Sequence, residues 1–398
     1  MRVKGRKMRI GIEATAALET RRTGVGNYVA QLLTGLHALD SGGASLELTL
    51  FANREAQPGT GTLASLPLPY RQDRLPIRTL WMQLGLPRSI ARLRPDLCHF
   101  PNHLAPVLRQ LDSPFVVTIH DMAVYRCPRY QPLKTSLIHR ALIPAVVRRA
   151  SLVLTVSESA RQDILEHLRL PEERVRVVYE GVHAAFHAAP SYSQVQGLRG
   201  RLGLQAPYIL SVGTLEPRKN HLGLVEAYTR LVLQQRVPHH LVIAGGQGWR
   251  NRALLERLAS CELRDRIHLL GYVDDADLPT LYQGAAAFAF PSWYEGFGLP
   301  VLEAFACGVP SLISHDPALR EIAGPGNALV ADPACPDEMA AALHRLLSDD
   351  PLRAMLRLRG LRRAREFSWE RCAQQTLSVY REATALAPVG RQLLSIGG

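Results

Sequence analysis

The chain has 398 residues, of which 47% are hydrophobic and 21% are charged. This composition is typical of a globular protein, and the length exceeds what one hydrophobic core usually supports, so two domains are expected. No stretch approaches the roughly 20 apolar residues that a membrane-spanning helix needs, and the basic residues 1–7 run into a predicted strand, which argues against a signal peptide. The six scattered cysteines lack metal-ligand spacing and favour reduced thiols in the cytoplasm.

The formal net charge of +12 is unevenly distributed. Residues 1–190 contain 25 Lys and Arg against 15 Asp and Glu, a balance of +10, whereas residues 191–398 contain 22 against 20. Such a one-sided field predicts an anionic surface as a partner. Aromatic residues make up only 6% and no RNA or DNA motif appears, so we expect membrane head groups and no nucleic acid.

Short β-branched runs alternate with helix-length segments along the chain, which predicts an α/β fold with parallel sheets and crossover helices. Strands are expected at 9–13, 116–120, 152–157, 175–179, 208–213, 241–245, 267–271, 286–291, 311–314 and 328–331. A polar segment rich in small residues separates the two series. We therefore predict an N-terminal Rossmann-like domain at 1–190, a linker at 191–204, and a C-terminal Rossmann-like domain at 205–398 whose last helix can pack back on the first domain. Ligands are expected in a cleft between the two domains, at the carboxyl ends of both sheets.

Three features of the first domain come after predicted strands. Gly24 and Gly26 precede an expected helix at 29–36, and a plain tight turn is the alternative explanation. His120 ends a strand, with Asp121 beside it to orient it or to cap the next segment; a purely structural histidine is the alternative. Ser157 is expected to cap a helix at 158–168.

The second domain contains a cationic loop after the strand at 208–213. Gly213 and Thr214 open this loop, and Arg218 and Lys219 come after them. Arginine offers a forked set of donors and lysine a compact charge, so the two together can neutralise a diphosphate without a metal ion. A solvated pair of surface cations is the alternative.

A glycine-rich stretch follows the strand at 286–291 and opens a helix. Gly296 and Gly298 allow backbone amides to approach a ligand, and Pro300 suits the first turn of a helix, whose N-terminus favours anions. Glu303 lies about one turn, ~5 Å, deeper along the helix than Pro300, a step similar to that from a diphosphate to its ribose. Glu295 remains on the loop.

The spacing of Glu295 and Glu303 resembles the E-x7-E signature of family 4 of the retaining GT-B glycosyltransferases, and the resemblance extends over nearly the whole chain. It implies that Glu295 holds sugar hydroxyls, that Glu303 binds the ribose, and that Arg218 and Lys219 bind the donor diphosphate. His120 is placed near the transferred sugar. We therefore predict as catalytic Glu295, His120, Arg218 and Lys219. Predicted donor contacts are Gly24, Gly26, Gly213, Thr214, Arg218, Lys219, Tyr272, Val273, Gly296, Phe297, Gly298, Leu299 and Glu303; Tyr272 and Val273 would line the nucleotide base.

Two further patterns bear on this prediction. Asp275 and Asp277 imitate a D-x-D metal motif, but a helix directly after them explains both as N-terminal caps, so no metal ligand is predicted. Where the family commonly shows Asn-Gly-Val-Asp, this chain has Glu180, Gly181, Val182 and His183. A donor contact from that turn is therefore left out of the predicted site.

The resemblance implies a retaining, metal-independent hexosyltransferase with no cofactor besides its donor substrate, a nucleotide-diphosphate sugar. GDP-mannose is favoured over UDP-glucose, and a glycan or lipid-linked glycan of cell-surface polysaccharide, such as lipopolysaccharide, is the expected acceptor. A sugar-nucleotide epimerase and a non-catalytic binding subunit are alternatives. Residues 75–94 and 134–149 mix apolar and basic residues, as interfacial segments do, so a cytoplasmic enzyme docked on the inner face of the membrane is expected.

Overall fold

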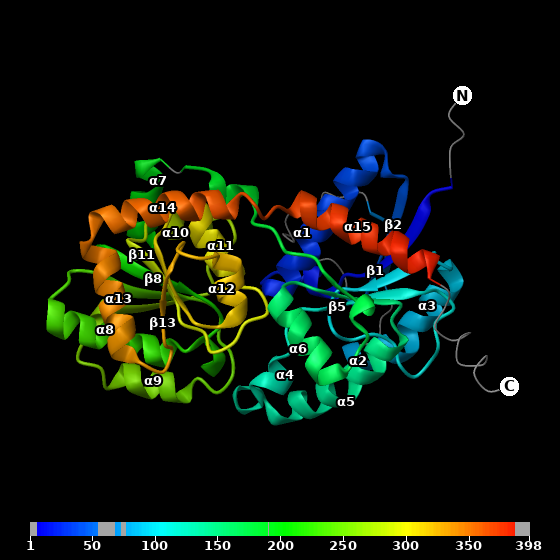
Figure 1. Cartoon of the computed structure of the whole chain (residues 1–398), viewed down its shortest axis with the longest axis horizontal. Helices are drawn as coiled ribbons and strands as arrows, with labels where there is room; N and C mark the ends of the chain where they lie inside the picture. Colours follow the sequence, from blue (N-terminus) through cyan, green and yellow to red (C-terminus); the bar gives the residue numbers. More distant parts are fainter. Residues whose placement is uncertain (1–5, 55–67, 73–76, 190, 387–398) are drawn as a thin grey trace. The chain divides into compact units, whose positions relative to one another are not determined.

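The computed structural model describes residues 6–54, 68–72, 77–189 and 191–386, and the chain forms two compact units. Unit 1 comprises residues 1–125, 133–181 and 369–398, and unit 2 comprises residues 126–132 and 182–368. Each unit has one parallel sheet with helices on its faces (Figure 1). Most of the basic stretch 1–7 and residues 75 and 76 lie outside the described residues.

The described residues of unit 1 contain a seven-stranded sheet in the order β3-β2-β1-β4-β5-β6-β7. Its strands are β1 (Met8–Glu13), β2 (Leu46–Ala52), β3 (Tyr70–Gln72), β4 (Leu97–Phe100), β5 (Phe115–Ile119), β6 (Leu152–Thr155) and β7 (Val175–Val177). Its helices are α1 (Gly24–Leu39), α2 (Arg78–Leu80), α3 (Leu86–Leu93), α4 (Ala123–Arg126), α5 (Leu133–Arg149), α6 (Glu158–Leu168) and α15 (Trp369–Ala385). The strands β2, β3 and β4 were not predicted.

Unit 2 has a six-stranded sheet within its described residues, in the order β10-β9-β8-β11-β12-β13. Its strands are β8 (Tyr208–Val212), β9 (His240–Ala244), β10 (Ile267–Gly271), β11 (Ala287–Phe290), β12 (Ser311–Ser314) and β13 (Leu329–Ala331), all close to the predicted ranges. Its helices are α7 (Tyr192–Arg201), α8 (His221–Gln235), α9 (Arg252–Ala259), α10 (Leu278–Gln283), α11 (Leu299–Ala306), α12 (Pro317–Ala323), α13 (Pro336–Ser348) and α14 (Asp350–Ala364).

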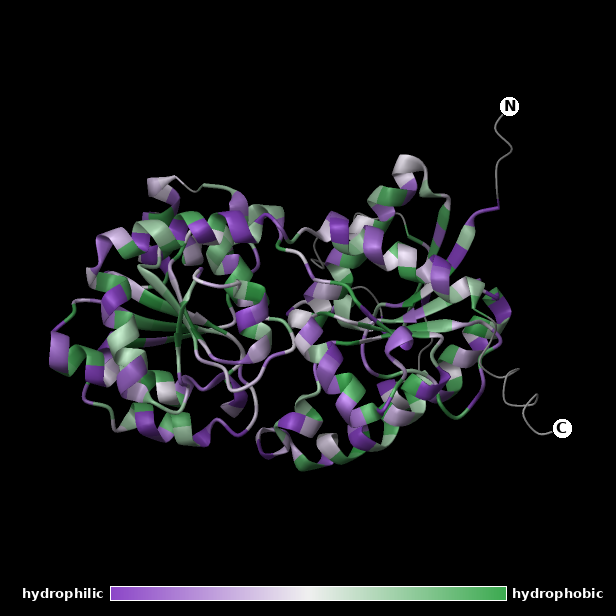
Figure 2. Ribbon diagram, viewed as in Figure 1, coloured by the Kyte–Doolittle hydropathy of each residue, from purple (hydrophilic) through white to green (hydrophobic). Residues whose placement is uncertain are grey.

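Hydrophobic burial explains both sheets. The strands β4, β5 and β6 in unit 1 and β11 and β12 in unit 2 are buried along their whole length, as expected for parallel strands covered on both faces. Figure 2 shows the same pattern, with green strands inside and purple on the outer faces of many helices. The predicted strands β5, β6, β11 and β12 were therefore recognisable from their continuous, mostly apolar sequences.

The predicted linker at 191–204 is wrong, because most of it forms α7. Ser191 accepts a hydrogen bond from the backbone of Gln194, whose side chain in turn accepts one from the backbone of Ser191. This reciprocal capping box stabilises the helix start that the small, polar composition concealed. The change of unit falls at Gly181 and Val182, before the predicted boundary.

The last helix, α15, belongs to unit 1 and packs on α1 (Figure 1). A side chain at Gly35 on α1 would come within 2.7 Å of the Ala373 side chain, so the glycine permits this close approach. The Tyr380 hydroxyl lies 2.7 Å from Nδ1 of the buried His99, and Arg176 forms an ion pair with Glu382. Residues distant in sequence thereby complete the core of unit 1.

The expected interfacial anchor at 75–94 is only partly exposed. Trp81 and Met82 are buried in the core of unit 1, and Arg78 pairs with the buried Glu13 at 3.1 Å. Arg88 and Arg92 face outward, as do the apolar Ile77, 61% exposed, and Leu80, 44% exposed. Among the described residues, no helix combines the length and apolar character needed to cross a membrane.

Candidate donor-binding and catalytic site

The loops after β8 and β11 lie side by side in unit 2. These two strands are neighbours in the sheet, and the chain leaves them toward opposite edges, which makes this the switch point where parallel α/β sheets bind ligands. The backbone amide of Trp293, after β11, donates to the carbonyl oxygen of Arg218, after β8, at 2.9 Å. The predicted cationic loop and glycine-rich loop are therefore brought together.

Glu295 binds both predicted cations. Arg218 Nη1 donates to Glu295 Oε2 at 2.9 Å, and Lys219 Nζ donates to Glu295 Oε1 at 2.6 Å. The other side of the Arg218 guanidinium donates to Glu216 Oε1 at 2.7 Å. All four side chains are largely buried, with 3–12% of their surface exposed. Two cations and two carboxylates thus form one compact, charge-balanced cluster.

The cluster shifts the pKa values of its two carboxylates in opposite directions. Burial alone would raise the pKa of Glu295, but the charges of Arg218 and Lys219 and the Lys219 hydrogen bond lower it to about 2. Burial dominates at Glu216 and raises its pKa, although Arg218 and Lys219 oppose that effect. Glu295 is consequently an ionised acceptor at any physiological pH.

Gly298 and Asp316 shape the turn that carries Glu295. Gly298 has φ +111° and precedes α11, and a side chain there would come within 2.6 Å of Leu319, so glycine is required. Asp316 accepts hydrogen bonds from the backbone amides of Glu295 at 3.3 Å and Leu319 at 3.0 Å, and burial raises its pKa to about 7. Asp316 was not predicted, although its position before Pro317 is that of a helix cap.

Glu303 lies on α11, one turn after Pro300, as predicted. Its Oε2 accepts a hydrogen bond of 2.8 Å from the hydroxyl of Tyr282, which is fully buried on α10. Glu303 as a residue is half-buried. Tyr282 on α10 therefore holds one of its carboxylate oxygens in place.

Gly213 and Thr214 lie directly after β8, next to a second glycine loop that was not predicted. Gly245 lies directly after β9, and a side chain there would come within 1.9 Å of the Gly213 carbonyl oxygen. The amide of Leu215 donates to the carbonyl oxygen of Gly246 at 3.0 Å. The glycines at 245, 246 and 248 were the sequence signal that could have predicted this loop, because glycines at the end of a strand often mark a close approach of two backbones.

Tyr272 and Val273 come directly after β10 and are half-exposed. The Tyr272 hydroxyl donates to Asp275 Oδ1 at 3.3 Å. Asp277 occupies the N-cap position of α10, but its side chain makes no capping bond and instead accepts from Arg201 Nη2 at 2.7 Å. The predicted capping role of its side chain is therefore wrong; an ion pair to α7 explains this carboxylate.

The two glycines predicted as donor contacts in unit 1 belong to a helix and not to a loop. Because α1 begins at Gly24, five residues before the expected start, both Gly24 and Gly26 lie in its first turn. A side chain at Gly26 would come within 2.7 Å of the Ala16 carbonyl oxygen, whereas the space beside Gly24 is open. Packing thus explains Gly26 and leaves Gly24 accessible.

His120 lies directly after β5 and is held by groups from three segments. Its Nδ1 lies 3.2 Å from Glu180 Oε1, and its Nε2 lies 2.9 Å from the carbonyl oxygen of Pro101. The Tyr28 ring packs edge-on against the imidazole, with 4.6 Å between ring centres. The Asp121 side chain serves the chain after it, since its Oδ1 accepts from the amide of Ala123 at the start of α4. The carboxylate that orients His120 is Glu180, which was left out of the predicted site.

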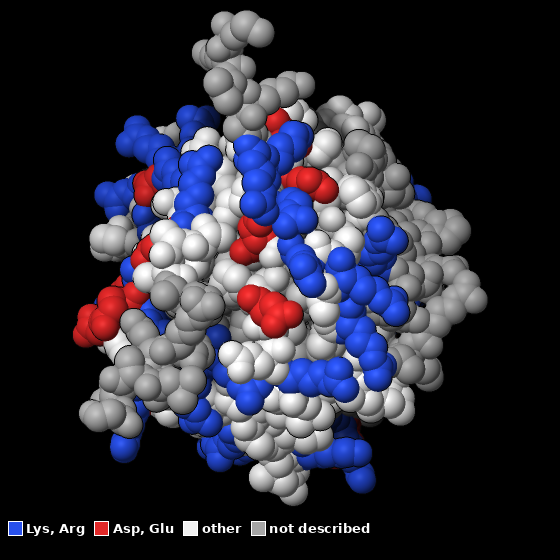
Figure 3. Space-filling view, turned by 90° about the vertical axis from the view of Figure 1, so that its right-hand side faces the viewer, with Lys and Arg blue, Asp and Glu red and all other residues white. Residues whose placement is uncertain are grey.

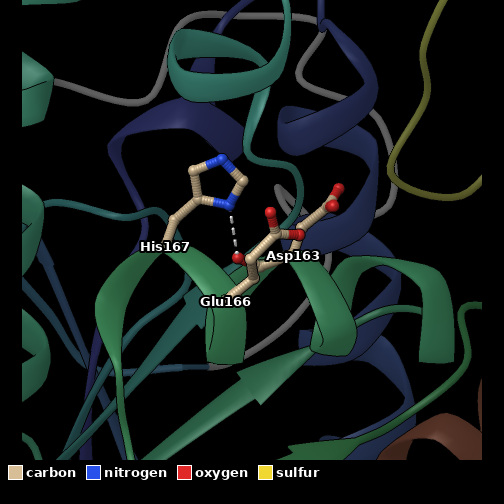
Figure 4. Close-up of side chains that lie close together, drawn as sticks. All are labelled: Asp163, Glu166 and His167. Atoms are coloured by element: carbon tan, nitrogen blue, oxygen red, sulfur yellow. Dashed lines mark hydrogen bonds between the residues drawn. The ribbon is translucent and has the colours of Figure 1, made fainter.

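Three side chains on α6 meet the geometric requirements of a metal cluster among the described residues, namely Asp163, Glu166 and His167 (Figure 4). They stand three and four residues apart, a spacing that brings side chains together on any helix. His167 Nδ1 also lies 2.9 Å from the Asp163 carbonyl oxygen. Helical spacing explains the cluster.

Ser157 caps the same helix, α6, because its side chain accepts a hydrogen bond from the Ala160 amide, as predicted.

Comparisons with known proteins give the family. Residues 22–186 match the family described as Glycosyltransferase Family 4, and residues 199–363 match that described as Glycosyl transferases group 1. The O-antigen chain mannosyltransferase B of Escherichia coli is 36% identical over 284 residues, which cover 71% of this chain and 73% of that protein. The chain therefore belongs to glycosyltransferase family 4 and is a glycosyltransferase, as the sequence predicted.

Two further similarities are weaker: one relative matches a smaller part of the chain, and one solved structure shares the fold alone. The serotype-specific mannosyltransferase WbdA of Escherichia coli is 34% identical over 235 residues, which are 58% of this chain and 28% of that protein. The crystal structure of Anabaena Alr3699/HepE in complex with UDP-glucose aligns with 94% of this chain and all of that chain, with a TM-score of 0.75 and 18% identity. Together with the two parallel sheets, this likeness confirms the predicted α/β fold of the GT-B class.

Proposed function

We propose that the protein transfers mannose from GDP-mannose to a hydroxyl of a glycan or lipid-linked glycan in cell-surface polysaccharide assembly, with retention of configuration at the anomeric carbon. The observation that carries this proposal is the pairing of Arg218 and Lys219 on the Glu295 carboxylate at the switch point of unit 2. The names of two relatives, both mannosyltransferases and one acting on O-antigen chains, support the choice of mannose and of a polysaccharide acceptor.

Binding of the donor exchanges the partners of the cationic cluster. The diphosphate oxygens take hydrogen bonds from Arg218 and Lys219, and Glu295 turns its freed acceptors to the hydroxyls of the sugar. Arg218 remains fixed by Glu216 and by the Tyr294 carbonyl oxygen at 2.8 Å, so its guanidinium is already oriented. Glu303, held through Tyr282, accepts from the ribose hydroxyls.

The reaction breaks the bond between the anomeric carbon and the phosphate oxygen and forms one to the acceptor oxygen on the same face. The acceptor proton passes to an oxygen of the departing diphosphate. Arg218, Lys219 and the N-terminus of α11 stabilise the negative charge that develops there. These groups supply the charge that a divalent ion would otherwise bring, so the reaction proceeds without one.

A panel of nucleotide sugars, tested for thermal stabilisation and for product formation, decides the donor. We expect GDP-mannose to raise the melting temperature most and to give product with retained configuration, read from the one-bond carbon–proton coupling at the anomeric centre. A larger effect of UDP-glucose would make the protein a glucosyltransferase. EDTA should leave the rate unchanged; a loss that magnesium or manganese restores would contradict metal independence.

Membrane docking through α5 is part of the same proposal. This helix exposes Leu133 by 69%, Leu137 by 61% and Ile138 by 43%, with Lys134 exposed among them. Figure 3 shows a face of unit 1 on which Lys and Arg side chains gather, which agrees with the charge balance of +10 over residues 1–190. Exposed apolar side chains beside the basic Lys134 fit an anionic bilayer.

Co-sedimentation with phosphatidylglycerol-rich vesicles tests this surface. Lys134→Glu should weaken binding about thirtyfold, since each charge at an anionic surface contributes about 1 kcal/mol and the reversal changes the charge by two. Salt should weaken binding further. Arg92→Glu on α3 is the matched control. Equal losses for both variants would remove α5 as the docking face, and equal binding to neutral vesicles would contradict an electrostatic attraction.

A further inference from the structure

Glu180 and His120 form a buried acid–histidine pair in unit 1 that no motif of the sequence connects. Glu180 lies three residues beyond β7, His120 lies directly after β5, and their atoms Oε1 and Nδ1 are 3.2 Å apart. Only 6% of the Glu180 side chain and 15% of the His120 side chain are exposed. A carboxyl group at this depth needs a hydrogen-bonding or charged partner, and the His120 imidazole lies in contact with it.

The two ring nitrogens of His120 both face acceptors. Nδ1 meets the Glu180 carboxylate and Nε2 meets the carbonyl oxygen of Pro101, neither of which can donate a hydrogen bond in its usual form. A neutral imidazole has a single N–H group and satisfies only one of these contacts, whereas an imidazolium satisfies both. The geometry therefore favours the doubly protonated ring.

The surroundings of His120 agree with that charge. Burial alone would lower the pKa of His120, but the hydrogen bond and charge of Glu180, the Pro101 carbonyl and the charge of Asp121 raise it. His99 on β4 and His103 face it as neutral groups, because burial lowers the pKa of each to about 3. Tyr28 on α1 packs against it as a neutral phenol, since burial raises its pKa.

We propose that Glu180 is a positioning residue of the transferase: it keeps His120 doubly protonated and fixes its ring, so that His120 serves the reaction as a cation and not as a proton acceptor. This inference rests on the proposed function and on the family resemblance, which implies that His120 lies near the transferred sugar. A doubly protonated imidazole has no free lone pair, so it cannot act as a general base. The acceptor proton must then go to another group, in agreement with its transfer to the departing diphosphate.

The first test is a titration of the His120 imidazole by NMR in the substrate-free protein, with the resonance assigned by its loss in His120→Asn. In the wild type we expect the pKa of His120 to be higher than that of a histidine in a short peptide. In Glu180→Gln we expect the pKa of His120 to be about 1–3 pH units lower than in the wild type. Glu180→Asp, which keeps the charge, should restore most of the shift. Glu173→Gln removes an exposed carboxylate two residues before β7 and is the matched control. A wild-type value at or below that of the peptide overturns the proposal, even if Glu180→Gln fails to fold.

The second test is the pH profile of kcat/KM. Because the cation is lost as pH rises through the pKa of His120, activity should fall on the alkaline side, and Glu180→Gln should move this limb down by the same amount as the NMR titration. A lowered pKa of His120 with an unmoved profile would leave Glu180 as a structural residue only. Failure of the donor proposal appears separately in the nucleotide-sugar panel and does not alter the NMR result.

Discussion

The donor loops of unit 2 and the His120 region of unit 1 both bury carboxylates, but they neutralise them with different cations. In unit 2, Glu295 is paired with arginine and lysine, whose charges do not change between pH 5 and 8. In unit 1, Glu180 is paired with a histidine, the side chain whose charge responds to pH in that range. The cluster around Glu295 is therefore expected to keep its charges near neutrality, whereas the charge on His120 can change there. Asp316, whose pKa burial raises to about 7, is the carboxylate of the donor loops that can also titrate in this range.

The largest expected effect comes from removing one cation of unit 2. Lys219→Met should lower kcat about 100–1000-fold, because a charged donor aimed at a developing anion contributes about 2.7–4 kcal/mol. Arg230→Met on α8, which removes a cation of the exposed ion pair with Asp337 in the same unit, is the control and should leave kcat within about twofold. Steady-state kinetics measures both, and an unchanged kcat in Lys219→Met would refute the assigned role.

Acid unfolding tests how much the pairing of Glu295 with its two cations stabilises unit 2. The pKa of Glu295 is lowered from 4.5 to about 2 in the folded protein, so its pairing stabilises the fold above pH 4.5 and this contribution, about 3 kcal/mol, is lost as pH falls toward 2. Glu295→Gln should therefore unfold more easily than the wild type at pH 7, and the gap should close in acid. Urea titrations from pH 7 to pH 3 test this, and a gap that does not narrow would contradict the pairing.

A smaller effect separates the two glutamates of the E-x7-E pattern. Glu303→Ala should raise the KM for the donor about tenfold, because its carboxylate serves the ribose in ground state and transition state alike. Glu295→Ala should mainly lower kcat, because in the proposed donor complex the Glu295 carboxylate holds the hydroxyls of the reacting sugar. If kcat of Glu295→Ala stayed within about twofold of the wild type, the assignment would be wrong.

The smallest effect concerns the two glycines in the first turn of α1. Gly26→Ala should destabilise the protein by about 1–3 kcal/mol, because its side chain would meet the Ala16 carbonyl oxygen. Gly24→Ala has open space and should cost no stability, or add up to about 1 kcal/mol. Urea unfolding distinguishes them. Lower activity of Gly24→Ala at undiminished stability would support a ligand contact, and unchanged activity would remove Gly24 from the site.

How much the sequence could predict differs between the two regions. The site residues of unit 2 lie on loops that follow mostly apolar, buried strands, and Arg218, Lys219 and Glu295 each come soon after such a strand. Adjacent parallel strands end at one edge of a sheet, so motifs after them meet. That rule sufficed to expect the cluster, although not the direct bonds between its members.

The same rule did not reach Glu180 or the helix at the predicted linker. Glu180 differs from the residue that the family commonly shows, and sixty residues separate it from His120, so only the pairing of β5 with β6 and of β6 with β7 brings them together. The strands β2, β3 and β4 also escaped prediction. Length does not explain this, because β2 has seven residues, whereas the predicted β7 and β13 have only three. Strand formation depends on packing against neighbouring strands more than on local pattern.

The sequence alone determined the α/β class, the six strands of unit 2, the capped start of α6 and the family, because these depend on hydrophobic periodicity and on motifs read within a few residues. Tertiary structure alone decided which carboxylate holds His120, that Trp81 is core and not anchor, and that α15 closes unit 1. These outcomes depend on which distant segments share a buried space. Buried polar and charged groups must be satisfied by whatever partner the fold brings within reach, and no local pattern specifies that partner.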